Sequence, residues 1–470
     1  MDIQIHGSGA TTGQSLNESC GIVALAENVQ VGYRLIQSLR IIQHRGQESA
    51  GISINTEKGF RNYRGMGLVN EVFSGLKLER DEGLGIGHIR YSTAGTSSIE
   101  NAQPFFARIG NFEISLGHNG EIVNAPELKR SLEKKGYSFL TDSDTEVIMK
   151  LLSIELSKSA DPILSMKNCF GKLVGAYSLD IMINKRVFVV RDPNGIRPLV
   201  IGSTKYGYGA ASESVVFDQL DGNVIRDVRP GEIVELKKDG IESYMFGEGK
   251  RVAHCMFEYV YFARPDSILD GENVFRVRKN IGKILARESG VPADCVVPVP
   301  DSGRTHAHGY AEESGIPFTE GLIKNRYVDR TFIMPEQSGR ESELDIKLNP
   351  VRELIDGKRV VLVDDSIIRG NTMRRIVSLL RKNGAKEVHV RIGSPPVKYP
   401  CYLGIDMKTK EQFIASGRDV EEISKIIGAD SLKYLSLEGL VEAIGLGKDN
   451  LCLGCLVGRY PVKIPRKPEA

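Results

Sequence analysis

Two patterns of hydrophobic and polar residues divide the chain. Residues 20–250 contain short apolar runs separated by polar, glycine-rich segments, which is typical of strands joined by loops that carry function. Residues 251–445 alternate strand-like and helix-like patterns, which predicts a mostly parallel sheet. Residues 1–19 are polar and we expect them to form a tail, while residues 446–470 form a short C-terminal segment. The chain is therefore predicted to be an α/β protein of two domains.

One apolar run is followed by a polar loop of unusual composition. Val360–Val363 suits a buried parallel strand, and the carboxylates of Asp364 and Asp365 follow where that strand should end. A hydroxyl, an arginine, a glycine and a second hydroxyl come next, before the helical pattern of residues 373–381. Backbone N–H groups and a helix N-terminus favour a phosphate there. Two carboxylates would repel that phosphate, so they must face sugar hydroxyls, a Mg²⁺ or both, unless the segment is a generic turn of a doubly wound sheet.

Composition narrows the class of protein. With 470 residues, 41% hydrophobic and 26% charged, the chain matches a soluble globular protein of two or three domains. Its net charge of +2 gives no case for nucleic-acid binding, and no apolar stretch approaches the roughly 18–20 residues that span a bilayer. Residues 1–19 lack the basic start and apolar middle of a secretion signal. Seven cysteines are an odd and sparse set that does not suit a disulfide framework, and we expect a cytoplasmic protein.

The N-terminal half has a cysteine, Cys20, at the start of its first apolar run. A free cysteine is usually a small buried hydrophobe, which is one interpretation of this residue. The polar segments downstream favour a site built from loops instead. These segments are Gln43–Gly51, Gly87–Thr93, Leu116–Asn124 and Ser143–Glu146.

This set of segments resembles the glutaminase domain of amidotransferases that use an N-terminal cysteine as the nucleophile. The resemblance implies a four-layer αββα domain over residues 20–250, and a mature chain that begins at Cys20 after removal of residues 1–19 as a propeptide. The chemistry suits these residue types, because a thiolate is the attacking species. The new α-amino group, with a pKa of about 7.7–8.0, then serves as the base.

The same resemblance assigns four further residues of this half. The Asn119 side chain and the Gly120 N–H would stabilise the tetrahedral oxyanion. Arg90 would bind the glutamine α-carboxylate, and Asp144 its α-ammonium group. Alternatives remain open, because Arg90 also suits an ion pair and Asn119-Gly120 is also the strongest short signal for a type I′ hairpin turn.

Five of the histidines are not assigned a catalytic role. His44, His88 and His118 are interpreted as satisfied core or loop residues rather than catalytic groups. His306 and His308, which follow the Pro-Asp-Ser-Gly segment described below, are expected to be exposed loop residues.

The acidic pair and the loop behind it resemble the motif with which type I phosphoribosyltransferases bind phosphoribosyl diphosphate (PRPP). The resemblance implies a domain of this type over residues 251–445. It also implies that Asp364 and Asp365 hold the ribose hydroxyls, directly or through Mg²⁺, while the following loop wraps the 5-phosphate. The loop residues that it assigns to the substrate are Ser366, Arg369, Gly370, Asn371 and Thr372.

Two further segments belong to the same resemblance. A predicted strand that starts at Cys295 ends in Pro300-Asp301-Ser302-Gly303, where the family has its diphosphate loop. This implies substrate contacts from Asp301 and Ser302, with Ser302 also beside Mg²⁺. The cationic stretch of residues 321–347 is either a solvated face or a mobile lid that closes over PRPP and excludes water. Its candidates for neutralising the leaving diphosphate are Lys324, Arg326 and Lys347.

Four more cysteines point to a metal centre. A redox pair would explain Cys452 and Cys455 but neither Cys255 nor Cys401. On chemistry alone, four thiolates suit Zn²⁺ and a [4Fe–4S] cluster equally well. The clustered form of the glutamine-dependent PRPP amidotransferase family has four cysteines in these contexts, which implies a [4Fe–4S] cluster with a structural role. Cys169 and Cys295 are expected to be ordinary core residues.

The two halves together resemble this family over nearly all of residues 20–460. The implied reaction converts glutamine, PRPP and water into 5-phosphoribosylamine, diphosphate and glutamate, the first step of purine (IMP) synthesis, with ammonia passing between two active sites. One Mg²⁺ per subunit, a homotetramer or homodimer, and inhibition by purine nucleotides are further implications. Two alternatives are a PRPP-sensing regulator without catalysis and a related enzyme that acts on a different sugar phosphate.

Overall fold

The N-terminal half begins with an eight-stranded sheet. A computed structural model describes residues 2–5, 20–91, 97–249, 251–325, 348–407 and 409–465. β1 lies parallel to β4, and the other neighbouring strands are antiparallel. Part of the expected N-terminal tail is therefore an edge strand. In spatial order the strands are β1 (Asp2–Ile5), β4 (Gly59–Met66), β3 (Ser49–Thr56), β5 (Leu84–Arg90), β2 (Gly21–Glu27), β11 (Gly207–Ala211), β10 (Val200–Thr204) and β12 (Asn223–Asp227).

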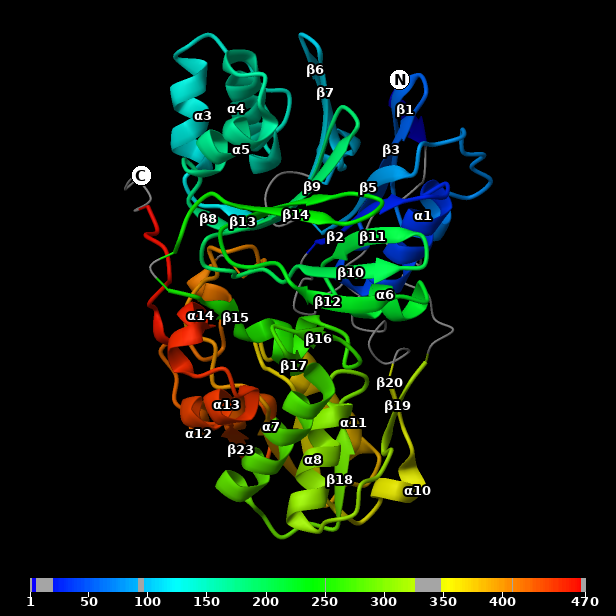
Figure 1. The fold of residues 1–470 in the computed structure, drawn as a ribbon. Coiled ribbons are helices and arrows are strands. Elements are labelled where there is room, and N and C mark those ends of the chain that lie inside the picture. The colour runs from blue at the N-terminus through cyan, green and yellow to red at the C-terminus, as the bar shows by residue number, and fades with distance from the viewer. Residues whose placement is uncertain are drawn as a thin grey trace.

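A six-stranded antiparallel sheet lies against this first sheet. Its strands in spatial order are β14 (Ile241–Met245), β13 (Glu232–Leu236), β9 (Arg186–Arg191), β8 (Gly175–Ile183), β7 (Phe112–Ile122) and β6 (Phe105–Ile109). Helices cover the two outer faces (Figure 1). On the first sheet they are α1 (Gly32–Ile41), α2 (Val69–Val72) and α6 (Val215–Gln219), and on the second α3 (Ala125–Glu133), α4 (Asp144–Lys158) and α5 (Pro162–Phe170). The predicted αββα layering is confirmed.

Alternation of side chains explains why β2 is apolar throughout. Ile22 and Ala24 face the second sheet, while Val23 and Leu25 belong to the core beneath α1. Because each face of the strand is buried against a different layer, every residue of β2 is buried. The nucleophile candidate that precedes β2 is thereby attached to the centre of the sandwich.

The second half contains a four-stranded sheet that is wholly parallel. The strands in spatial order are β18 (Cys295–Pro298), β21 (Arg359–Asp364), β22 (Glu387–Ile392) and β23 (Ser431–Tyr434). Val361 and Val363 pack toward the helices α7 (Val274–Ser289), α8 (Arg304–Ser314) and α13 (Leu437–Ile444). Val360 and Leu362 pack toward α11 (Asn371–Lys382) and α12 (Val420–Ile427). Both faces are covered, as a parallel sheet requires, and the predicted parallel sheet is confirmed.

Short elements complete the chain. Two-stranded ladders pair β15 (His254–Cys255) with β24 (Leu451–Cys452), β16 (Ile268–Leu269) with β17 (Glu272–Asn273), and β19 (Leu322–Lys324) with β20 (Leu348–Pro350). The short helices are α10 (Arg352–Ile355) and α14 (Gly454–Val457). Single turns are η1 (Gln43–Arg45), η2 (Ile99–Asn101), η3 (Glu258–Phe262), η4 (Lys410–Gln412) and η5 (Lys448–Asn450).

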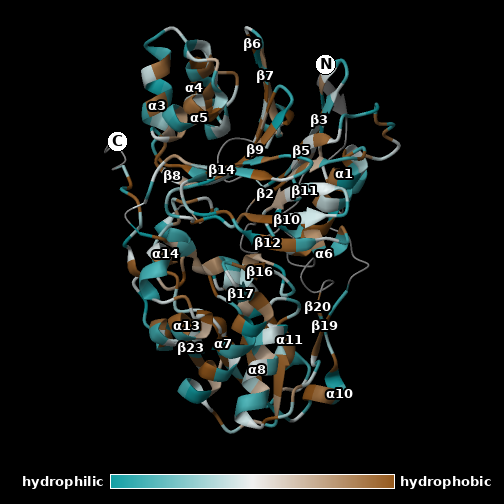
Figure 2. Ribbon diagram, viewed as in Figure 1, coloured by the Kyte–Doolittle hydropathy of each residue, from teal (hydrophilic) through white to brown (hydrophobic). Residues whose placement is uncertain are grey.

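One hydrophobic core runs across the boundary between the two halves. Leu35 and Phe217 of the first half belong to the same buried cluster as Phe257 and Leu285 of the second. Figure 2 shows hydrophobic colour along strands such as β18 and hydrophilic colour over much of the outer helical surface. The predicted core cysteines are confirmed, since Cys169 and Cys295 lie in two further clusters. Within the described ranges, no helix has both the length and the apolar character needed to cross a bilayer.

Candidate active sites

Cys20 lies directly before β2 and is nearly inaccessible, with 6% of its surface exposed. Its thiol donates a weak hydrogen bond to the carbonyl oxygen of Tyr91, 3.4 Å away, just after β5. Burial raises the pKa of the Cys20 thiol, while that hydrogen bond and the Arg90 guanidinium act in the opposite direction. The predicted nucleophile is thus a buried thiol beside a cation.

The predicted oxyanion residues lie inside a strand rather than on a turn. Asn119 and Gly120 belong to β7 and pair with Ser178 and Tyr177 of β8, so the hairpin interpretation is wrong. The pairing continues to the end of β7 because a glycine can adopt φ 151° at position 120, where a Cβ atom would lie 1.9 Å from the carbonyl oxygen of Ala176.

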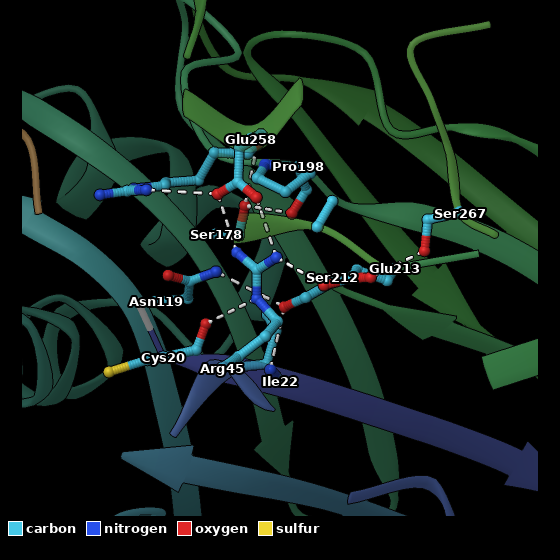
Figure 3. Close-up of polar contacts among 12 residues, drawn as sticks. Cys20, Ile22, Arg45, Asn119, Ser178, Pro198, Ser212, Glu213, Glu258 and Ser267 are labelled. Atoms are coloured by element: carbon cyan, nitrogen blue, oxygen red, sulfur yellow. Dashed lines mark hydrogen bonds and ion pairs between the residues drawn. The ribbon is translucent and has the colours of Figure 1, made fainter. Parts of the chain in front are cut away.

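Ser212 connects Asn119 with the strand that follows Cys20. The Ser212 hydroxyl accepts a hydrogen bond from the backbone N–H of Ile22 at 3.0 Å and another from Asn119 Nδ2 at 3.5 Å (Figure 3). Among the described residues, the buried Oδ1 of Asn119 has no hydrogen-bond partner. The amide is therefore held at one end, next to the segment that carries the thiol.

The two residues predicted to bind glutamine border the same region. Arg90 ends β5 and forms a buried ion pair with Glu48, so it is not a surface ion pair. Asp144 opens α4, where its Oδ2 accepts a hydrogen bond from the N–H of Ile122 at 2.9 Å. Its Oδ1 lies 3.5 Å from His118 Nδ1. Asp144 is thereby joined to the end of β7, two residues beyond the predicted oxyanion hole.

The histidines of this half are mostly core residues, as predicted, but not fully satisfied ones. His88 is completely buried, and its Nε2 lies 3.0 Å from the carbonyl oxygen of His118. Burial lowers the pKa of His88 to about 3, so its ring is neutral. Within the described part of the chain, His88 Nδ1 and His118 Nε2 have no partner. His44 is partly exposed and lies 2.7 Å from Glu213.

The parallel sheet of the second half brings the acidic pair next to the Pro-Asp-Ser-Gly segment. Ser302 follows β18 and Asp364 ends β21, and these neighbouring strands end at the same edge. Ser302 Oγ donates to Asp364 Oδ1 at 3.4 Å, and the N–H of Asp365 donates to the same oxygen at 2.9 Å. Ser366 Oγ donates to Asp365 at 2.6 Å. Four of the predicted PRPP residues thus form one cluster of oxygen atoms.

Of the three predicted cationic residues, Lys324 lies within the part of the chain that the structure describes. Lys324, on β19, forms an ion pair of 2.9 Å with Asp301, and both side chains are about half exposed. The two charges lie beside the strand edge, where diphosphate is expected. Arg326 and Lys347, together with most of the predicted lid, lie outside the described residues.

The predicted phosphate loop leads directly into a helix. Gly370 adopts the left-handed conformation (φ 81°) and precedes α11, whose first residues are Asn371 and Thr372. The N–H groups of this first helical turn have no acceptor within the helix and suit an anion. Arg369 donates to Gln412 at 2.8 Å, a contact that no pattern in the sequence indicates.

The acidic cluster fits a magnesium ion that is completed by substrate. Burial raises the pKa of Asp364 well above its usual range, and the neighbouring Asp365 carboxylate raises it further. A divalent cation relieves such a charge, and Mg²⁺ is commonly held by one or two carboxylates plus substrate oxygens. In the described ranges no group of three or more His, Cys, Asp or Glu side chains is arranged to hold a metal ion. The oxygen ligands that the chain offers at this edge are the two carboxylates and the Ser302 hydroxyl, and a magnesium site there stays a prediction.

The four remaining cysteines come from three distant segments and converge. Cys255 and Cys452 are partners in the β15–β24 ladder. Burial raises the pKa of the Cys455 thiol well above its usual value. The neighbouring thiols of Cys401, Cys452 and Cys255 raise it further. All four are free and buried, with 8–9% of their surfaces exposed. Thiols are ligands of soft metals, but no group of three or more cysteines in the described ranges is arranged to hold a metal ion, so the metal centre stays a prediction.

Sequence reasoning missed a buried ionic network between the halves. It consists of Arg45, Glu213, Glu258 and Arg197. Figure 3 shows Arg45, Glu213 and Glu258 beside Cys20. Arg45 and Glu258 both lie in segments with recognised motifs. Neither periodicity nor motif spacing indicates that Arg45 and Glu258 are partners, because they lie more than 200 positions apart in the sequence.

Comparison with known proteins agrees with this division of sites. The model of the glutamine amidotransferase domain family matches residues 88–219, and that of the phosphoribosyl transferase domain family matches residues 266–392. The chain therefore combines a glutamine amidotransferase with a phosphoribosyltransferase.

Full-length relatives identify the particular family. The chain is 51% identical to the amidophosphoribosyltransferase of Methanothermobacter thermautotrophicus, covering 96% of both chains, and 46% identical to that of Bacillus subtilis, again covering 96% of both. A solved structure of the glutamine PRPP amidotransferase of B. subtilis, complexed with ADP and GMP, has a TM-score of 0.88 at 45% identity and covers 95% of this chain and 98% of that one. The chain belongs to the amidophosphoribosyltransferase family.

Proposed function

We propose that the two sites divide one reaction between them. The chain is a glutamine-dependent amidophosphoribosyltransferase, which converts glutamine, PRPP and water into 5-phosphoribosylamine, diphosphate and glutamate in the first step of purine synthesis. One observation supports this division most directly. The site around Cys20 and Asn119 and the acidic strand edge around Asp364 lie in two halves that share one continuous hydrophobic core. We propose domain limits of 20–250 and 251–445.

The first half releases ammonia. In the chain that begins at Cys20, the α-amino group takes the thiol proton and the thiolate attacks the side-chain amide carbon of glutamine. Asn119 Nδ2 and the Gly120 N–H donate to the oxyanion, and ammonia leaves with the proton returned by the α-ammonium. Water then cleaves the thioester to give glutamate. Arg90 and Asp144 hold the two charged ends of glutamine throughout.

The second half transfers ammonia to the sugar. Asp364 and Asp365 orient the ribose, while the loop from Ser366 to α11 holds the 5-phosphate. Ammonia attacks the anomeric carbon as the bond to diphosphate breaks, and Lys324 lies where it can neutralise the leaving group. Mg²⁺, when bound by Ser302 and the two carboxylates, supplies further charge neutralisation. The roles of Arg326 and Lys347 as lid cations stay predictions.

The remaining assignments concern the cofactor and the setting. We propose that Cys255, Cys401, Cys452 and Cys455 hold a [4Fe–4S] cluster with a structural role, supported by the pairing of Cys255 with Cys452 and by the burial of all four residues in one cluster. Removal of residues 1–19 as a propeptide, a homotetrameric or homodimeric assembly, and inhibition by purine nucleotides belong to the same proposal. A cytoplasmic location is supported by seven free cysteines.

Glutamate release by anaerobically purified protein with Mg²⁺, with and without PRPP, tests the function. Release that PRPP strongly stimulates supports two coupled sites. Release that ignores PRPP favours the alternative enzyme with another sugar phosphate. No release in either condition, from protein whose N-terminus is confirmed at Cys20, favours a PRPP sensor. Cys20→Ala is the matched control, because it should abolish glutamine use and retain synthesis from added ammonia at high pH.

A further inference from the structure

Arg45 occupies a central position between the nucleophile and the second half of the chain. Its side chain is completely buried, and its Nε donates to the carbonyl oxygen of Cys20 at 3.2 Å. Its Nη1 donates to Glu213 at 2.8 Å and to Glu258 at 2.9 Å, and its Nη2 donates to Glu258 at 2.8 Å. All three nitrogen atoms of the guanidinium therefore donate hydrogen bonds, and the acceptor of Nε is the backbone carbonyl of Cys20.

The two carboxylates come from different halves. Glu213 precedes α6 of the first half, whereas Glu258 opens η3 of the second half, three residues after Cys255. Glu258 also accepts from Arg197 Nη1 at 3.3 Å, and Arg197 Nη2 donates to the carbonyl oxygen of Leu403 at 2.8 Å. Two guanidinium groups face two carboxylates, so the buried charges are balanced.

A second contact supports the same connection. The loop after Cys401 reaches the oxyanion strand, since a Cβ atom at Gly404 would lie 2.9 Å from the carbonyl carbon of Gly120 and 2.7 Å from Arg197 Nη2. The second half therefore touches both parts of the glutaminase machinery, the Cys20 backbone through Arg45 and the Gly120 backbone directly.

We propose that Glu258 is a positioning residue for glutamine cleavage. Through Arg45 it fixes the Cys20 carbonyl, and with it the backbone from which the thiol and the α-amino base project. Every link is a hydrogen bond of at most 3.2 Å between buried groups, so a shift of η3 displaces the nucleophile rather than being absorbed by solvent. A displacement of about 1 Å is enough to lower an enzymatic rate by about 100-fold. The inference rests on the proposed role of Cys20.

Glu258→Gln in the processed enzyme with its metal centre loaded is the direct test. The amide keeps the shape of the carboxylate, and Arg45 stays paired with Glu213. Arg197 loses its carboxylate partner and keeps its hydrogen bond to the carbonyl oxygen of Leu403, so the folding of this variant is checked first. We expect kcat with glutamine to fall by about 10- to 100-fold, with KM for glutamine within about twofold because Arg90 and Asp144 are unchanged. Synthesis from ammonia should stay within about twofold of the parent.

Asp270→Asn is the matched control. Asp270 forms another bidentate ion pair between the halves, with the buried Arg191 at 2.7 and 3.0 Å, and it does not contact Cys20. This variant should keep the parental kcat with glutamine. Equal losses in both variants would mean that any weakening between the halves has the same effect, and the inference would fail. A parental kcat in Glu258→Gln would also overturn it.

Two further measurements keep the result interpretable. The rate at which a diazoketone analogue of glutamine labels Cys20 should fall in parallel with kcat, and iron content should match the parent. If Glu258→Gln does not fold, Arg45→Lys replaces it, because lysine keeps the charge between the glutamates and loses the Nε donor to Cys20. Glutamine activity in Cys20→Ala would instead contradict the proposed nucleophile itself.

Discussion

Burial and catalysis impose opposite demands on Cys20. The apolar surroundings raise the pKa of its thiol, yet the thiolate is the species that attacks. In the full chain the residue before Cys20 makes its nitrogen an amide, which cannot accept a proton. Exposure of an α-amino group at Cys20 would add both a base and, when protonated, a cation that lowers the thiol pKa. Removal of residues 1–19 would therefore change the chemistry of the nucleophile.

The pH dependence of alkylation tests this argument. The thiolate reacts, and a raised pKa means that less thiolate is present at a given pH. In the chain that keeps residues 1–19, the iodoacetamide rate at Cys20 should rise about tenfold per pH unit between about pH 7 and 9. The chain that begins at Cys20 should react faster at pH 7 and reach its plateau at lower pH. Peptide mapping by mass spectrometry gives both rates, and a plateau below about pH 8 in the unprocessed chain would contradict the raised pKa.

Gly404 gives a second test at the level of one residue. It has φ 96°, and a Cβ atom there would push against the backbone of Gly120. Gly404→Ala should lower kcat with glutamine by about tenfold or more and leave synthesis from ammonia near the parental rate. Gly417→Ala is the control, because Gly417 has φ 71° and nothing within 4 Å of its added Cβ. Equal effects of the two variants would trace the loss to backbone strain rather than to Gly120.

At the scale of elements, the sequence correctly predicted the strands and helices that follow from the periodicity of apolar residues. The βα alternation after residue 251 and the parallel sheet are confirmed. The sheet also brings Ser302 within 3.4 Å of Asp364, because neighbouring parallel strands end at one edge, while the role of these residues stays a prediction. The Asn119-Gly120 turn was wrong, since pairing with β8 extends β7 through a dipeptide that favours turns in isolation. His306 and His308 lie on α8 instead of a loop, and His306 is buried against neighbouring elements. Tertiary contacts of this kind leave no local signal.

The strand edge of the second half can be tested through Gly303. A Cβ atom there would lie 2.4 Å from the carbonyl oxygen of Val363 and 3.1 Å from Asp364 Cα. Gly303→Ala should displace β21 from β18 at the acidic pair and raise KM for PRPP by about tenfold with either nitrogen source. Gly240→Ala, which meets nothing within 4 Å, should leave that KM unchanged. An effect limited to glutamine would show that the contact serves the other site.

On the scale of the whole molecule, the two halves share one core but keep their own buried titrating groups. His88 lies between the sheets of the first half, and His306 lies on α8 of the second. Burial lowers the pKa of each to about 3. Burial raises the pKa values of Glu213 and Asp270, but ion pairs outweigh it and hold both below their usual range: His44 and Arg45 act on Glu213, and Arg191 and His254 act on Asp270. Histidines and carboxylates therefore weaken the fold in different pH ranges.

Between about pH 6.5 and 5.5 the buried histidines should dominate the loss of stability. The folded chain keeps His306 neutral, whereas the unfolded chain, with an ordinary pKa, takes up a proton. Stability is therefore fully present above about pH 6.5 and falls as the pH decreases, by at most about 1.4 kcal/mol per pH unit for each such histidine. His306→Asn should flatten the pH dependence of the unfolding transition of the second half, measured by urea midpoints above the carboxylate range. His308→Asn, two residues along the same helix with an exposed ring stacked on Phe318, should retain the parental slope. Equal slopes in all three proteins would show that His306 takes up its proton without unfolding, through a rearrangement around α8.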